Sequence, residues 1–592
     1  MTFVVVTELE AFLAREYGVS RPGIRPERPP EEMKGDITVN CFRLARDLRT
    51  NPMQIAATAT EFVRRHDDVE DVDCIKAFVN IVLKPAALFR DAVADEQALL
   101  ADPKLDEAAR KRLVIEFSAP NTNKPQHLGH VRNNSLGQAM VSLLKRVGHE
   151  IIPVNLVNDR GIHICKSMLA YQRWGNGATP ESTGTKGDHF VGDFYVKFES
   201  EYRRQVDALR ENRPELSEKA DEELFLDTDI GRAAQQLLVN WEKGVPETVE
   251  LWEKMNSWVL DGFNQTYKRM NVHFDRTYLE SETYRDGREI IRQHLDEAVF
   301  RTRDDGAVVI DLDEEDLGSK VVLRSDGTSV YVTQDIGTTV RKQEDYRPDG
   351  QMWVVGDEQI FHFQVLFAIL KRLGYKWADH LYHLPYGMVH LPSGKMKSRE
   401  GTVVDADDLF DEMERLAREA TLERSPECPA DIDTRAAVIG MAALKFMLLR
   451  VNPKTAIMFD PEASIKFEGD TGPYVLYAYA RISSMLRKAG TDAFADPVDW
   501  AVLGTPEEKD LALRCADYTE TVQHAAREYD TSALANYVLG LAKAFSRFYR
   551  DCPVLAAPSP AVRRARLELS RRVQCLLKDG LSALSIDTLE SM

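Results

Sequence analysis

Apolar residues follow a strand and helix pattern between residues 113 and 157. A short apolar run at 113–117 predicts a strand, and 131–146 predicts a helix that ends near Gly148. One face of that helix is apolar and carries Leu136, Met140, Leu143, Leu144 and Val147. A second apolar run at 151–157 predicts another strand. This order predicts a β-α-β unit, in which two parallel strands are joined by a helix.

The segments before and after this unit have different patterns. Residues 1–108 combine helical sequence with a strand at 77–83, which predicts a separate α+β domain. The β-α-β unit opens a parallel-sheet domain at 109–172, and charged helical sequence at 173–300 predicts an insertion.

The second half of the parallel-sheet domain is predicted at 301–428. Its strands are expected at 307–312, 320–323, 329–333 and 352–355, with a hairpin turn at Asp326-Gly327. Residues 429–592 are apolar at helical spacing in 436–449, 533–549 and 567–584, which predicts an all-α domain. The predicted fold class is therefore a multidomain α/β protein with a parallel-sheet domain, a helical insertion, an N-terminal α+β domain and a C-terminal helical bundle.

Composition places the chain among ordinary soluble proteins. It has 592 residues, of which 44% are hydrophobic and 29% charged, enough for about three or four domains. No apolar run approaches the roughly 18 residues of a membrane helix, so no membrane association is expected. The seven cysteines are scattered and form no Cys-x-x-Cys pair, which favours a reducing, cytoplasmic location and no structural zinc.

The clearest chemical motif lies where the predicted helix after residue 130 begins. His127, Gly129 and His130 follow a strand and open a helix, and a helix N-terminus attracts anions. Gly129 lets a ligand approach the backbone. Spacing alone would equally fit a pair of structural histidines. The strand–loop–helix context, together with a second, lysine-rich loop at 393–404, favours a nucleotide phosphate site.

Five further polar residues are expected near carboxyl ends of sheet strands, where open α/β folds bind ligands. They are Glu150, Asn155, Tyr331, Asp335 and Gln359. Two carboxylates with neutral polar partners suit a planar guanidinium, which pairs with carboxylates through two parallel hydrogen bonds. Ordinary salt-bridged strand ends explain the same residues equally well when they are taken alone.

Taken together, the motifs resemble those of class I aminoacyl-tRNA synthetases, and more closely the arginyl-tRNA synthetases. The two loops resemble the paired signature loops of class I, with Leu128 in the first and a degenerate lysine loop in the second. The arginyl resemblance adds the sequences that begin at Ser118, Asn155, Tyr331, Phe467 and Asn536 and extends to the last residues of the chain. It implies a Rossmann-type catalytic domain and a C-terminal anticodon-binding domain.

The resemblance implies a substrate set and a site. The substrates are ATP, accompanied by Mg²⁺, L-arginine and the arginine tRNA. The arginine site is expected to comprise Ser118, Asn121, Glu150, Asn155, Tyr331, Asp335 and Gln359. The ATP site is expected to comprise His127, Gly129, His130, Lys395, Met396, Lys397, Ser398 and Arg399. His127, His130, Lys124 and Lys395 are the candidate catalytic residues. A monomer that activates arginine only when tRNA is present is also implied.

Two parts of this interpretation leave alternatives. The usual second lysine of the lysine-rich loop is replaced by Ser398, so Lys124, Lys397 or Arg399 is expected to supply that charge. Contacts with tRNA are expected at Phe78 and Asn80 in the N-terminal domain. In the helical bundle they are expected at Arg481, Arg547, Phe548 and Arg550, with the alternative that Phe548, because of its helical spacing, is a core residue.

Three other functions fit parts of the sequence. A class I lysine enzyme would need to bind the point charge of an ammonium group rather than the planar guanidinium group. A tRNA-binding relative without catalysis is favoured only by the degenerate loop. A small-molecule ligase of the same nucleotide fold would not need the helical bundle.

Overall fold

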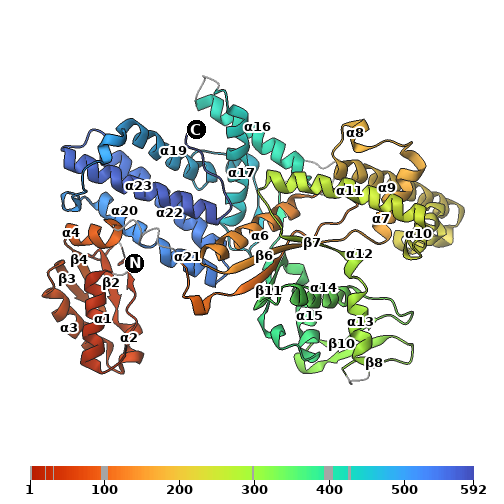
Figure 1. Cartoon of the computed structure of the whole chain (residues 1–592), viewed down its shortest axis with the longest axis horizontal. Helices are drawn as coiled ribbons and strands as arrows, with labels where there is room; N and C mark the ends of the chain where they lie inside the picture. The colour runs from red at the N-terminus through yellow and green to blue at the C-terminus, as the bar shows by residue number, and fades with distance from the viewer. Residues whose placement is uncertain are drawn as a thin grey trace. The chain divides into compact units, whose positions relative to one another are not determined.

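The computed structural model describes residues 3–20, 22–30, 32–94, 104–295, 299–392, 404–424 and 429–592 (Figure 1). Its contacts divide the chain into two compact units. One comprises Met1–Leu105, Ala420–Phe446 and Ile465–Met592, and the other comprises Asp106–Glu419 and Met447–Ser464. The predicted domain boundaries at 108, 172, 300 and 428 stay predictions. Within the described part of the chain, every helix is too short or too polar to cross a bilayer.

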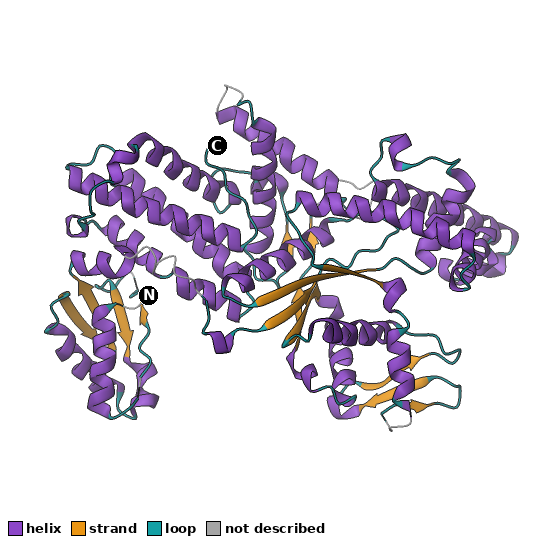
Figure 2. Ribbon diagram, in the orientation of Figure 1, coloured by secondary structure: helices purple, strands orange, loops and turns teal. Residues whose placement is uncertain are grey.

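A parallel sheet of five strands lies at the centre of the second unit (Figure 2). In spatial order its strands are β12 (Leu381–Tyr386), β11 (Gly350–Gly356), β5 (Arg112–Glu116), β6 (Glu150–Val157) and β7 (Arg276–Leu279). All four neighbouring pairs are parallel. Helix α6 (Leu128–Arg146) joins β5 to β6, and α15 (Ile360–Arg372) leads from β11 to β12 on the other side.

The strand order reverses between the neighbours β5 and β11. After β5 the chain continues to β6 on one side, and after β11 it continues to β12 on the other side. Ligands bind open parallel sheets at such a reversal, outside the carboxyl ends of the strands. The predicted parallel sheet and its first β-α-β unit are confirmed. The sheet interior includes Val114, Ile152, Val154 and Tyr278, which pack as one apolar cluster.

Most of the predicted insertion at 173–300 is helical, but this stretch also contains strand β7 of the parallel sheet. Helices α7 (Ile162–Trp174), α9 (Gly187–Asn212), α10 (Asp229–Glu242) and α11 (Pro246–Arg269) pack against one another (Figure 1).

The strand predicted at 352–355 is confirmed as part of β11, but the other strands predicted after residue 301 form a different structure. Strands β8 (Arg301–Thr302), β9 (Val308–Leu312) and β10 (Gly318–Leu323) form a separate antiparallel sheet and do not continue the parallel one. The predicted strand at 329–333 is instead the start of helix α14 (Tyr331–Tyr346). Its apolar residues Val332, Ile336 and Val340 recur every four positions and are all buried. This helical spacing outweighs the short β-branched run.

The other unit contains the N-terminal α+β domain and the helical bundle. Four antiparallel strands form a sheet in the spatial order β1 (Pro26–Glu27), β2 (Ile37–Asn40), β4 (Phe78–Leu83) and β3 (Val69–Ile75). Helix α3 (Pro52–Arg64) packs on β3 and β4 and also contacts helix α1 (Val4–Tyr17). Strand β4 (Phe78–Leu83) confirms the strand predicted at 77–83. The bundle includes α17 (Ile432–Leu449), α19 (Gly472–Ala489), α20 (Pro506–Ala516), α21 (Tyr518–Arg527), α22 (Thr531–Asp551) and α23 (Pro560–Ala583). These helices confirm the three helical segments predicted there.

Candidate active site

The two predicted histidines form a cap at the N-terminus of α6. The backbone N–H of Gly129 donates to Nδ1 of His127 at 3.1 Å, and the N–H of His127 donates to Nδ1 of His130 at 3.2 Å. Because both Nδ1 atoms accept, each neutral ring carries its proton on Nε2. A Cβ added to Gly129 would lie 2.9 Å from Cε1 of His127, so this position has no room for a side chain.

Both imidazoles are neutral at pH 7. Burial, reinforced by the charge of Lys124, lowers the pKa of His127 to about 4. Burial also lowers the pKa of His130 well below its usual value. The site therefore presents two neutral Nε2–H donors next to the positive end of a helix, an arrangement suited to phosphate oxygens.

The loop that follows β5 turns sharply at two residues in left-handed backbone conformations. Ser118 has φ 78° and Ala119 has φ 47°. The N–H of Ser118 donates to Oδ1 of Asn133 at 2.6 Å, and that of Ala119 donates to Oδ1 of Asn155 at 3.0 Å. The hydroxyl of Tyr267 lies 2.8 Å from Oγ of Ser118 and accepts from Nδ2 of Asn155 at 3.1 Å. The surrounding side chains therefore hold a strained turn in place.

These contacts change the interpretation of two predicted arginine ligands. Ser118 is 4% exposed and Asn155 is 1% exposed. Both ends of the Asn155 amide are bonded within the protein. Asn155 supports the turn at Ser118 in this structure, and its predicted contact with arginine stays a prediction.

A cavity of about 750 Å³ opens beside this loop. It is lined by Asn121, Lys124 and Tyr331 from the predicted site, together with Arg160, His163, Glu280 and Gln334. Tyr331 is 65% exposed, and Asn121 and Lys124 are exposed as well. A volume of this size suits a small polar ligand.

The charged side chains that line the cavity are Glu280 and the three cations Lys124, Arg160 and Arg324. Glu280 lies at the carboxyl end of β7, and burial raises its pKa to about 7 although Arg160 is only 3.6 Å away. Asp335 is in the first turns of α14, with Oδ2 2.6 Å from Nε2 of His362. Its negative charge is the main cause of a raised pKa at Tyr331. Glu280, Asp335 and Tyr331 therefore form one electrostatic group.

Glu280 was missed by the sequence analysis. The signal was a short strand, 276–279, directly followed by an acid, but this stretch was assigned to the insertion. In the structure the strand is the edge of the parallel sheet, so its carboxyl end lies at the ligand-binding edge.

Glu150 was assigned wrongly. It is the first residue of β6, at the amino end of the strand, and its side chain is 59% exposed. It pairs with Arg112 at 2.7 Å. Amino ends of parallel strands lie at the sheet edge opposite the ligand site, so Glu150 cannot contribute to the predicted pocket.

Gln359 lies at the predicted strand–loop–helix junction, in the short turn Asp357–Gln359 between β11 and α15. Lys395, Met396, Lys397, Ser398 and Arg399 lie outside the residues that the structure describes.

The predicted RNA contacts of the N-terminal domain differ in exposure. Phe78 is half-buried and packs on Phe42, with ring centroids 5.7 Å apart. Asn80 is 1% exposed, so its side chain is not accessible to RNA in this conformation. Phe42, which was not predicted, is 50% exposed and offers the larger free aromatic surface.

The predicted contacts of the helical bundle also differ. Phe548 is fully buried, which contradicts its predicted stacking on a base. Arg547 pairs with Asp510 at 2.9 Å, and Arg550 is 71% exposed beside an acidic neighbour. Arg481 lies over the ring of Tyr477 at 4.6 Å. The arginines are therefore available at the surface, whereas the phenylalanine belongs to the core.

Three family models match the chain in succession. They are described as the arginyl tRNA synthetase N terminal domain, the class I (R) tRNA synthetase catalytic domain and the DALR anticodon binding domain, and they match residues 6–83, 95–460 and 475–592.

Curated and solved relatives match over the whole chain. An arginine–tRNA ligase of Parabacteroides distasonis is 41% identical and covers 97% of this chain and 96% of its own. One of Treponema denticola is 42% identical, with 96% and 95% covered. The solved arginyl-tRNA synthetase of Thermus thermophilus superposes with a TM-score of 0.78 at 27% identity and covers all of both chains.

Proposed function

The chain belongs to the arginyl-tRNA synthetase family, and from this membership we propose how its site joins L-arginine to the arginine tRNA. In the first step the arginine carboxylate attacks the α-phosphate of ATP, which gives arginyl-adenylate and pyrophosphate. In the second step a terminal ribose hydroxyl of the tRNA attacks the adenylate carbonyl and AMP leaves. Neither step needs a protein nucleophile, so positioning and charge stabilisation carry the catalysis.

The cavity between the Ser118 loop and α14 is the proposed arginine pocket. Glu280 and Asp335 would receive the guanidinium, with the Tyr331 hydroxyl beside them. The single observation that carries this proposal is the electrostatic coupling of Asp335 with Glu280 and Tyr331, the two members of the group that line the cavity. Asn121 and Gln359 would orient the head group of arginine, and the Ser118 turn would shape its site.

The α6 cap is the proposed ATP phosphate site. His127 and His130 would donate through Nε2–H, and Gly129 would let the phosphate approach the backbone. Lys124, which lines the neighbouring cavity proposed for arginine, would add the cation that the lysine-rich loop lacks at Ser398. Lys395 and its neighbours would contact the pyrophosphate, and Mg²⁺ would arrive bound to ATP.

The proposed tRNA surface uses exposed arginines and aromatic rings. Arg481, Arg547 and Arg550 would meet phosphates, and Phe78 with Phe42 would stack on an unpaired base. A cytoplasmic monomer without structural zinc completes the proposal. The lysine-specific and non-catalytic alternatives are disfavoured, because the relatives matched over the full length are named arginine–tRNA ligases.

Arginine-dependent ATP–pyrophosphate exchange tests the proposal, measured with and without arginine tRNA and with lysine as the control amino acid. Exchange only with arginine and only with tRNA is expected. Exchange without tRNA would retain the arginine assignment and remove the tRNA requirement. Absence of exchange with tRNA still bound would identify a non-catalytic tRNA-binding protein.

A further inference from the structure

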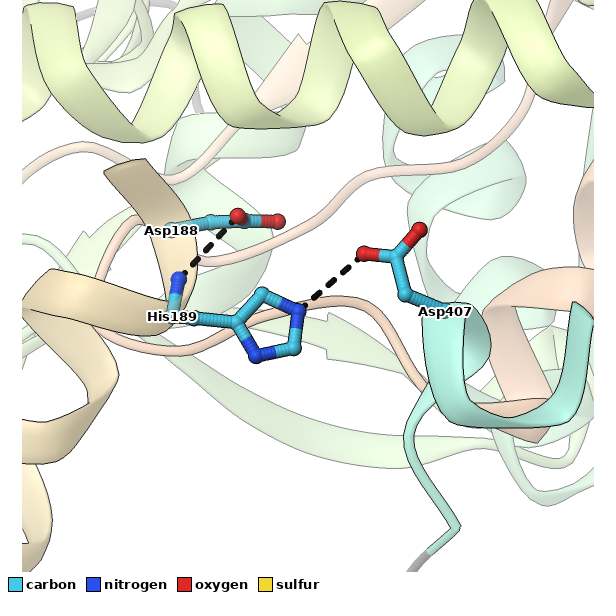
Figure 3. A group of neighbouring side chains, drawn as sticks. All are labelled: Asp188, His189 and Asp407. Carbon is cyan, nitrogen blue, oxygen red and sulfur yellow. Dashed lines mark hydrogen bonds and ion pairs between the residues drawn. The ribbon is translucent and has the colours of Figure 1, made fainter. Parts of the chain in front are cut away.

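A charged cluster outside the proposed pockets joins the insertion to the start of helix α16 (Ala406–Arg424). Nζ of Lys186 lies 3.1 Å from Asp188 and 2.6 Å from Asp407. Nε2 of His189 lies 3.1 Å from Asp407 and 3.6 Å from Asp405. Figure 3 shows the imidazole of His189 directed at the carboxylate of Asp407. We call these five residues the Lys186 cluster.

The cluster is closely packed around Asp188, is partly exposed at its other members, and contains its own cation. Asp188 is fully buried, and a Cβ added to Gly262 would lie 2.4 Å from its Oδ1. Asp188, His189 and Asp407 have metal-ligating atoms within 4.8 Å of one another, yet the ammonium of Lys186 already supplies positive charge to both aspartates. The cluster is therefore an ion network rather than a metal centre.

Asp407 is connected through the backbone to the phosphate-site histidine. The N–H of Ala406 donates to the carbonyl of Gln126 at 3.0 Å, and the N–H of Leu128 donates to the carbonyl of Val404 at 2.9 Å. These two bonds bracket His127 on both sides and form an isolated antiparallel bridge between His127 and Asp405. A displacement of the α16 start would therefore displace His127.

Lys186 is connected to the arginine side of the site through helix α11. Its Nζ donates to Oγ1 of Thr266 at 2.5 Å. The next residue, Tyr267, bonds to Ser118 and Asn155 and so supports the turn at the arginine pocket. The Lys186 ammonium therefore bonds to two helices. One is α16, whose start is bonded to the backbone around His127, and the other is α11, whose Tyr267 supports the turn at Ser118.

We propose that Lys186 and Asp407 are positioning residues for arginine activation, because their ion pair fixes His127 relative to the Ser118 turn. This inference rests on the proposed function. The reacting groups are the arginine carboxylate and the α-phosphate. Asp407 fixes the position of His127 at the phosphate site, and Lys186 fixes helix α11, which supports the Ser118 turn at the arginine site. Misplacement of reacting groups by about 1 Å costs on the order of 100-fold in rate.

The test compares Lys186→Met, Asp407→Asn and the double variant with the wild-type protein in tRNA-supported pyrophosphate exchange. Each single variant is expected to lower kcat by about 10- to 100-fold while KM for arginine changes by less than about two-fold. The double variant is expected to be no slower than the worse single variant, because both substitutions break the same pair. Arg415→Met is the matched control, since it removes two surface ion pairs, with Glu412 and Glu419, on the same helix α16.

Thermal unfolding of each variant accompanies the kinetics. Wild-type kcat in folded Lys186→Met and Asp407→Asn proteins would overturn the inference. So would a loss of kcat that tracks the folded fraction and disappears on cooling, or one that Arg415→Met reproduces. If Lys186→Met does not fold, Asp407→Asn decides by the same criteria. Failure of the wild-type protein to catalyse exchange would instead overturn the proposed function, and with it this inference.

Discussion

Lys342 and Glu116 form a buried ion pair at the carboxyl end of β5, with Nζ 2.6 Å from Oε2 and side chains only 1% and 8% exposed. Trp353 is the strand neighbour of Glu116, and the Lys342 ammonium lies 4.4 Å from the centre of its ring. Lys342 belongs to α14, whose first turns carry Tyr331 and Asp335. The pair therefore fixes the helix that bears the guanidinium-binding groups to the central strand of the sheet.

Removal of one partner of this pair is expected to be strongly destabilising. Lys342→Met leaves a buried carboxylate without compensation and should cost about 3–5 kcal/mol. It should therefore lower the temperature of the catalytic unit's thermal unfolding transition. The double variant Lys342→Met/Glu116→Gln should recover part of this loss, since it removes both charges. Equal unfolding temperatures for Lys342→Met and the wild-type protein would contradict the assignment.

Arginine use is expected to weaken in acid because of Glu280. Its folded-state pKa is raised from 4.5 to about 7, so the free enzyme gains a proton there as pH falls and loses the negative charge that attracts arginine. The raised pKa means that the folded state holds this proton more tightly than the unfolded state does. The contribution of Glu280 to the free energy of unfolding therefore declines as pH rises from about 4.5 to about 7. kcat/KM for arginine should fall as pH drops through about 7.

Glu280→Gln provides the control for this pH dependence. The substitution should remove the inflection near pH 7 and lower kcat/KM at pH 8 by about 10- to 100-fold, since a charge-assisted hydrogen bond is lost. An unchanged profile in the variant would assign the inflection to another group.

Lys124 is expected to act on the phosphates rather than on arginine. Lys124→Ala should reduce kcat for exchange by about 100-fold or more while the affinity for arginine stays within about three-fold. Calorimetric titration with arginine and steady-state exchange measure the two effects separately. Near-wild-type exchange in this variant would leave Lys397 or Arg399 as the source of the charge.

Substitutions of Phe548 and Arg550 are expected to have different effects, because Phe548 is a core residue and Arg550 lies at the surface. Phe548→Ala should destabilise the bundle by about 3–5 kcal/mol, because the side chain is fully buried. Arg550→Ala should leave stability within about 0.5 kcal/mol. It should weaken tRNA binding and reduce the slope of log affinity against log salt by about one. A salt slope equal to that of the wild-type protein would remove Arg550 from the RNA surface.

Sequence pattern located the sheet and the α6 cap because long, strongly periodic segments specify their own structure. The strand at 113–117, the helix from 131 and the strand at 151–157 each appear within a few residues of their predicted bounds. The histidine cap followed from the same pattern, since the position of a helix start also determines which residues lie there.

The remaining site residues depended on information that local pattern does not contain. Glu150 is an exception, because it directly precedes the strand predicted at 151–157, and the sequence therefore already placed it at the amino end of that strand. Glu280 became visible only when β7 paired with β6 across an insertion of more than 100 residues. Phe548 has the spacing of a core residue, and its neighbouring arginines suggested a surface that packing excludes.

Tyr267 gives the insertion a part in building the site, because its hydroxyl bonds to both Ser118 and Asn155 from helix α11. A minimal enzyme made by splicing residue 172 to residue 301 would therefore lose the support of its own pocket along with the excised helices. Efforts to shorten the protein, or to exchange this segment between relatives, should keep α11 and its tyrosine with the sheet as one transferable part.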